Sequence, residues 1–70
     1  MIDYNSIFEK YLVKLEYCKG YRLGAIYARL IANGEIGIDI SFLFLFIKID
    51  KRFICEMSNT IDNIIIRKIE

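Results

Sequence analysis

Histidine, tryptophan, proline and glutamine are all absent from this chain of 70 residues. The lack of histidine matters most, because histidine is the commonest general base in enzymes and a common metal ligand. Without it, Ser6, Ser41 and Ser58 have no imidazole partner that would activate a hydroxyl for nucleophilic attack. We therefore expect a protein that is not an enzyme.

Cysteine is scarce as well, with only Cys18 and Cys55 present and no CxxC motif. Isolated cysteines in a cytoplasmic protein are typical of small buried hydrophobic side chains rather than of a disulfide. Two thiols do not complete a four-ligand zinc site in one chain, and their spacing does not favour a site shared by two copies. Glu35 and Asp39 are expected to be solvated rather than a catalytic pair. The sequence thus predicts no metal and no cofactor.

Neither sign of charge is in excess, because ten Lys and Arg residues face nine Asp and Glu residues, for a net charge of +1. Such a chain has no strong overall field, which disfavours both an acidic mimic of DNA and a generic basic nucleic-acid coat. The N-terminal residues are charged from Asp3 onward and lack the apolar core of a signal peptide. We expect a cytoplasmic protein.

Apolar residues are abundant, at 56% of the chain. Seventy residues form one domain, residues 1–70, close to the lower size limit at which one hydrophobic core is stable without help. A domain this small cannot easily bury so much apolar surface by itself. The composition therefore favours a protein that associates with a partner.

Helical spacing of apolar residues predicts two helices in the first half of the chain, over residues 7–18 and 21–33. Ser6 and Glu9 form a capping-box pattern before the first helix. Gly20 is expected to end it in a left-handed conformation, and the pair Asn33-Gly34 to end the second.

From Glu35 the apolar pattern changes to a period of two, which predicts a strand as far as Ile49. Asp50 and Lys51 suit a tight turn, and residues 52–58 a returning strand. Residues 59–70 favour a third strand, with a helix as the alternative. The predicted fold class is α+β, with two N-terminal helices on a two- to three-stranded antiparallel sheet, in the order α-α-β-β-β or, in the alternative, α-α-β-β-α.

The stretch Ser41–Ile49 is apolar on both faces of the predicted strand. Two helices cover only one face, so the other requires a partner, and a second copy is the simplest one. We expect a homodimer whose interface contains Leu43, Leu45, Ile47 and Ile49. The apolar run 36–49 is too short to span a membrane and includes two charged residues.

A second surface is expected to bind a target protein, because Tyr and Arg are enriched where proteins meet. Its predicted residues are Tyr17, Lys19, Arg22, Arg29, Lys51 and Arg52. Lys19 precedes a predicted helix N-terminus that suits an anion, although a simple interhelical turn is the plainer interpretation. Lys51 and Arg52 lie with Lys48 at the predicted hairpin tip. These charges suit contact with nucleic-acid phosphates, although a solvated hairpin tip is the plainer interpretation. A helix-turn-helix over residues 21–41 is not expected, because a strand pattern replaces the second helix.

The sequence therefore predicts a small binding protein that acts as a homodimer on an unidentified protein target. An inhibitor or accessory factor fits this size and composition, including a counter-defence protein of a phage or other mobile element, of the anti-CRISPR kind. One alternative is a nucleic-acid-binding regulator that uses Arg22, Arg29, Lys51 and Arg52. Another is a small membrane-associated protein without a membrane span.

Overall fold

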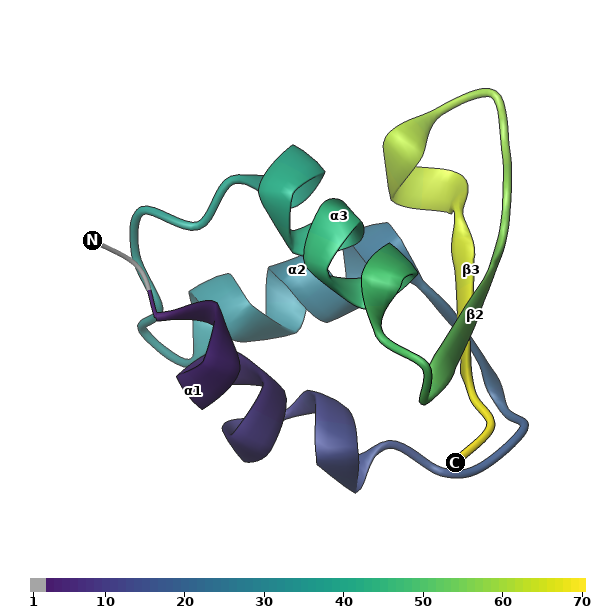
Figure 1. Cartoon of the computed structure of the whole chain (residues 1–70). Helices are drawn as coiled ribbons and strands as arrows, with labels where there is room; N and C mark the ends of the chain where they lie inside the picture. The colour runs from purple at the N-terminus through teal and green to yellow at the C-terminus, as the bar shows by residue number, and fades with distance from the viewer. Residues whose placement is uncertain (1–2) are drawn as a thin grey trace.

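The computed structural model describes residues 3–70, which form three helices and one three-stranded antiparallel sheet. The helices gather on one side of the sheet, as Figure 1 shows. In chain order the elements are α1 (Tyr4–Lys10), η1 (Leu12–Lys14), β1 (Gly20–Arg22), α2 (Leu23–Ala32), α3 (Ile40–Ile49), β2 (Phe53–Glu56), η2 (Ile61–Asn63) and β3 (Ile65–Lys68), where η denotes a 3-10 turn.

Helix α1 begins earlier and ends sooner than its sequence pattern predicts. Its N-cap is Asp3, whose carboxylate accepts the backbone N–H of Ser6 at 3.2 Å, so the predicted capping role of Ser6 is wrong. The helix stops at Lys10 and η1 prolongs it to Lys14. The left-handed residue that follows is Cys18, with φ of 62°, rather than Gly20.

The second helix is present as predicted, but in the structure it begins at Leu23, two residues after the predicted start. Gly20–Arg22 is strand β1, which pairs with β3, and Tyr21 lies opposite Ile66. Helix α2 therefore begins at Leu23. It ends as predicted, because Gly34 adopts a φ of 88° just after the last turn and needs no β-carbon there.

Residues 40–49 form helix α3, so the predicted strand over this stretch is wrong. The carboxylate of Asp39 accepts the N–H of Ser41 at 2.8 Å and caps the helix. The inward side chains have helical spacing, one turn apart, and they are Ile40, Leu43, Phe44 and Ile47. Nearly every residue of the run is apolar, so its sequence fits a period of two as well as a helical period. The fit to a period of two therefore did not indicate a strand.

The sheet pairs different segments from those expected. The predicted hairpin of residues 35–49 with 52–58 does not form, and Asp50 is instead the C-cap of α3. Strand β2 pairs with β3, so the prediction of a C-terminal strand is confirmed and the helix alternative is wrong. The strand order is β1-β3-β2. The class α+β is thus correct, while the order α-α-β-β-β is replaced by one in which β1 precedes α2 and a further helix precedes β2.

The core lies where the three helices meet the inner face of the sheet. Its fully buried side chains come from η1, α2, α3 and the central strand β3, and they are Leu12, Leu23, Leu30, Leu43, Ile47 and Ile66. Tyr4 stacks on Phe46 with ring centroids 4.7 Å apart, and Phe8 meets Phe53 edge-on at 5.7 Å. These contacts fix α1 against α3 and β2.

The helices and strands follow one another in the order α1, β1, α2, α3, β2 and β3, and β3 lies between β1 and β2 in the sheet. Helices α2 and α3 are joined by residues 33–39, and β2 and β3 form an antiparallel pair. The strand expected after α2 is helix α3, so the strand pattern that argued against a helix-turn-helix in residues 21–41 is not present in the structure. A fold does not set a function by itself, so the function is argued from the side chains that the fold exposes.

Candidate protein-binding surfaces

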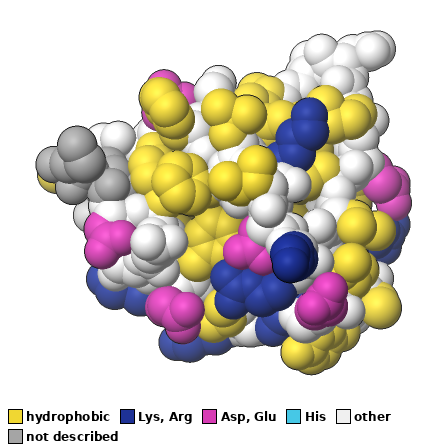
Figure 2. Space-filling view, viewed as in Figure 1, with side chains coloured by type: hydrophobic (Ala, Val, Ile, Leu, Met, Phe, Trp, Pro, Cys, Tyr) yellow, Lys and Arg dark blue, Asp and Glu magenta, His cyan; other side chains and the backbone are white. Residues whose placement is uncertain are grey.

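The outer side of α3 exposes three large apolar side chains. Phe42, Leu45 and Ile49 follow one another at helical spacing and keep 56%, 50% and 78% of their surface exposed. We call these three residues the α3 face. In Figure 2, hydrophobic side chains cover the part of the molecule where α3 lies in the same view of Figure 1. Exposed apolar side chains gathered in this way make the α3 face a candidate interaction site.

The four residues predicted for a dimer interface divide between the core and this face. Leu43 and Ile47 are completely buried within the chain, so the expectation that they face a partner is wrong. Leu45 and Ile49 are exposed on the α3 face. Phe42 belongs with them but was not expected there, because a strand pattern places it on the opposite side from Leu45.

Opposite charges lie at the two ends of α3. Asp39 precedes the helix, and Lys48 is in its last turn with its ammonium 5.7 Å from the Phe44 ring. Within residues 3–70, neither charge forms an ion pair. The α3 face is therefore bordered by the capping carboxylate of Asp39 at one end and by the ammonium of Lys48 at the other.

Arg52, one of the predicted binding residues, is partly exposed and is held by contacts within the chain. Its Nε and Nη2 atoms donate to the two carboxylate oxygens of Asp50 at 3.0 and 2.8 Å. These hydrogen bonds hold the pKa of Asp50 below its usual value and raise the pKa of Arg52. The guanidinium also lies over the rings of Phe8 and Phe53. Lys51 beside it is exposed, at the junction of α3 and β2 rather than at a hairpin tip.

Tyr17 and Lys19 lie in the connection between η1 and β1. The buried amine of Lys68 donates to the Val13 carbonyl and lies 4.5 Å from the centre of the Tyr17 ring. Lys19 forms an exposed ion pair with Glu16 at 3.8 Å. Because β1 separates Lys19 from α2, Lys19 does not directly precede a helix N-terminus, as the less favoured anion-site interpretation requires.

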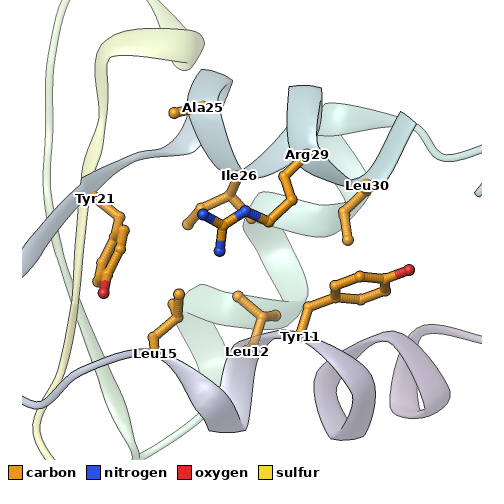
Figure 3. Close-up of a pocket in the computed structure, with 8 residues that line it drawn as sticks. All are labelled: Tyr11, Leu12, Leu15, Tyr21, Ala25, Ile26, Arg29 and Leu30. Carbon is orange, nitrogen blue, oxygen red and sulfur yellow. The ribbon is translucent and has the colours of Figure 1, made fainter. Parts of the chain in front are cut away.

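A small pocket opens between η1 and α2, with a volume of about 60 Å³. Its lining is mainly apolar and consists of Tyr11, Leu12, Leu15, Tyr21, Ala25, Ile26, Arg29 and Leu30. Figure 3 shows the Arg29 guanidinium extending across this pocket from α2. Arg22, predicted to act with Arg29, lies at the end of β1 and does not line the pocket.

The two tyrosine hydroxyls at the pocket are both fixed by hydrogen bonds. Tyr11 donates to Glu35 at 3.0 Å, and burial together with this bond raises the pKa of Tyr11. Glu35 is also 3.7 Å from the Lys10 amine. At the other end, the Tyr21 hydroxyl accepts the Glu16 N–H at 3.2 Å, which leaves its own proton free to be donated.

The groups considered for catalysis or metal binding are dispersed. Glu35 contacts Tyr11 and Lys10 whereas Asp39 caps α3, so the two carboxylates have separate structural partners. Cys55 is half-buried, and burial raises the pKa of its thiol. Cys18 is exposed, so the expectation of two buried cysteines is only half correct. Within residues 3–70, no cluster of three possible metal ligands occurs.

The helices of the described chain, residues 3–70, are all too short to cross a lipid bilayer. This agrees with the expectation of no membrane span. Comparison of the chain with protein-family models, with curated proteins and with solved structures finds no match.

Proposed function

We propose that this chain is a small non-enzymatic binding protein that forms a homodimer through α3 and acts on another protein. The observation that carries the proposal is the chemistry of the α3 face. Helix α3 buries Leu43 and Ile47 in the core, whereas its large exposed side chains are the apolar Phe42, Leu45 and Ile49. Their burial against a partner would contribute about 25 cal/mol for each Å² of apolar surface removed from water.

A second copy suits this face because the face is self-complementary. If two α3 helices pack antiparallel across a two-fold axis, Leu45 meets Leu45 of the second copy and Phe42 approaches Ile49 of the second copy. The same arrangement brings Lys48 towards Asp39 of the second copy, at the opposite end of its helix. The apolar centre and the two charged ends thus match in a single arrangement.

Cross-linking through a central cysteine tests this geometry. In a background with Cys18→Ser and Cys55→Ala, Leu45→Cys is expected to form a disulfide-linked dimer under mild oxidation, because both copies of position 45 lie near the axis. Ile54→Cys is the matched control, since Ile54 is 46% exposed but lies on the outer face of β2. Equal cross-linking of the two variants, or none in the first, would overturn the proposal.

Nucleic-acid binding is the second candidate. It is favoured by the order of the elements, because two successive helices, α2 and α3, are followed by the antiparallel strands β2 and β3. The exposed residues of α3 supply a single cation, Lys48, where a groove-reading helix would present polar side chains. The loop between β2 and β3, residues 57–64, has no Lys or Arg and contains Asp62. A salt-dependent shift of duplex DNA or RNA in a gel at physiological salt would favour this candidate over protein binding.

The counter-defence role expected from size and composition remains a proposal within the protein-binding class. An inhibitor needs only a surface that matches its target, and this chain supplies one apolar face and one pocket with a cation beside it. A pull-down with the purified protein, repeated with Leu45→Lys, separates a target bound at the α3 face from one bound elsewhere.

A further inference from the structure

We infer that the pocket between η1 and α2 binds an acidic segment of the target protein, with an apolar side chain in the pocket and an adjacent carboxylate on Arg29. The inference rests on the proposed protein-binding function and names the chemistry that the target would present. It concerns a surface separate from the α3 face, since no α3 residue lines the pocket.

The size of the pocket selects a side chain rather than a free metabolite. Its 60 Å³ is several times the space of one water molecule and well below the roughly 300–1,000 Å³ of typical small-molecule sites. The floor is formed by Leu12, Leu15, Ile26 and Leu30, each of them buried or nearly so. An aliphatic or aromatic side chain from a partner would exclude water from this floor.

The charge beside the pocket selects a carboxylate. Arg29 is exposed, and within residues 3–70 its guanidinium has no ion-pair partner. The carboxylate at the Tyr11 end of the pocket, Glu35, is already paired with Lys10 and hydrogen-bonded to Tyr11. Arg29 therefore provides the uncompensated charge of the pocket lining, and its planar fork matches a carboxylate in a bidentate geometry.

Two further residues suit a peptide. The Tyr21 hydroxyl has a free proton that can be donated to a backbone carbonyl of the bound segment. Ala25, on the rim between Tyr21 and Arg29, is small and exposed, so it lets a backbone approach α2 closely. Apolar floor, cation and hydroxyl donor thus lie within one pocket, and Figure 3 shows all three groups around the same opening.

A displayed peptide library tests the inference without knowledge of the target. The probe is a random library of twelve-residue peptides fused at their C-termini to the phage coat protein, so that no free C-terminal carboxylate is offered. Panning against the full chain is expected to enrich peptides with Asp or Glu within four residues of a large apolar residue. Neutral or basic consensus peptides, or no enrichment, would overturn the inference.

Matched variants then locate the binding of the enriched peptide. Arg29→Gln is expected to weaken binding on the order of tenfold to a hundredfold, because it removes charge-assisted hydrogen bonds. Arg22→Gln, which removes the same charge outside the pocket, should leave affinity within about twofold. Ala25→Leu should block the pocket and abolish binding while the circular dichroism spectrum stays unchanged. Equal losses in Arg29→Gln and Arg22→Gln would contradict a specific site.

The oligomeric state of each variant, measured by light scattering, keeps this inference apart from the proposed function. A chain that forms dimers and binds no acidic peptide would refute the pocket assignment alone. A chain that binds acidic peptide through Arg29 and stays monomeric would refute the α3 homodimer alone.

Discussion

Arg52 and Asp50 are joined by two side-chain hydrogen bonds, of 3.0 and 2.8 Å, at the point where α3 ends and β2 is about to begin. The Asp50 carboxylate also accepts the backbone N–H of Arg52 at 2.9 Å. This pair therefore closes the connection between the helix and the strand. It also keeps the Arg52 guanidinium over the rings of Phe8 and Phe53.

We expect Asp50→Asn to lower the free energy of unfolding by about 1 kcal/mol, after allowance for partial exposure of the pair to solvent. Urea unfolding followed by circular dichroism measures the change. Glu56→Gln is a suitable control, since its ion pair with Arg67 is more exposed and should contribute less. A smaller effect at Asp50 than at Glu56 would show that the connection does not depend on this pair.

Acid should weaken the protein through the same carboxylate. The pKa of Asp50 is lowered in the folded chain, chiefly by its hydrogen bond with the Arg52 side chain. Its contribution is therefore fully present above the unfolded pKa of about 3.9 and is lost as the pH falls through the lower folded value. The difference in unfolding free energy between wild type and Asp50→Asn should shrink between pH 5 and the acid limit. A constant difference would contradict this linkage.

The N-cap of α3 gives another prediction. Asp39→Ala removes the acceptor for the Ser41 N–H and should cost about 1 kcal/mol, whereas Asp39→Ser keeps an acceptor and should cost less. Thermal unfolding of the two variants at one protein concentration measures the difference. Equal melting temperatures for Asp39→Ala and Asp39→Ser would mean that the cap does not hold the helix start.

Leu43 and Leu45 distinguish a helix from a strand directly. In a strand, residues two apart share a face, but on α3 Leu43 is fully buried and Leu45 is half exposed. Leu43→Ala should lower the free energy of unfolding by about 2–5 kcal/mol. Leu45→Ala should cost less than about 1 kcal/mol at a concentration where the chain is monomeric. Similar losses at the two positions would contradict the helix.

The same two residues show why the sequence alone predicted this segment wrongly. Periodicity identifies an element only when polar residues mark one face, and between Phe42 and Ile47 no polar residue occurs. A helix whose outer side is also largely apolar lacks the polar residues that would distinguish its two sides. The one remaining sign of a helix was Asp39, which suits an N-cap before Ile40 and Leu43. A single capping residue is weaker evidence than a long run of residues that also fits a strand.

Other elements could be predicted because their signals are separate from burial. The glycine at position 34 ends α2, and the run of isoleucines from Ile64 to Ile66 favours the extended chain of β3. The short strand β1 could not be predicted, since Gly20–Arg22 is extended only by its pairing with β3. For the surfaces, Leu45, Ile49 and Arg29 follow from residue type, whereas the pocket beside Arg29 depends on how η1 packs against α2.

The two cysteines should differ in reactivity. Cys18 is exposed, whereas burial raises the pKa of the Cys55 thiol and so lowers its thiolate fraction near neutral pH. A colorimetric disulfide reagent at pH 8 should therefore modify one thiol rapidly and the second slowly. Cys18→Ser should remove the fast phase and Cys55→Ala the slow one. A single phase for both thiols would mean that Cys55 is more accessible than the structure shows.

Sedimentation velocity over a concentration series tests most directly whether the α3 face joins two copies. The variants are Leu45→Lys, which places a charge at the centre of the proposed contact, and Ile54→Lys, which makes the same change at a similarly exposed site on β2. We predict that wild type and Ile54→Lys shift from monomer to dimer as concentration rises, while Leu45→Lys remains monomeric. A wild type that stays monomeric throughout, or a Leu45→Lys variant that still forms dimers, would contradict the account.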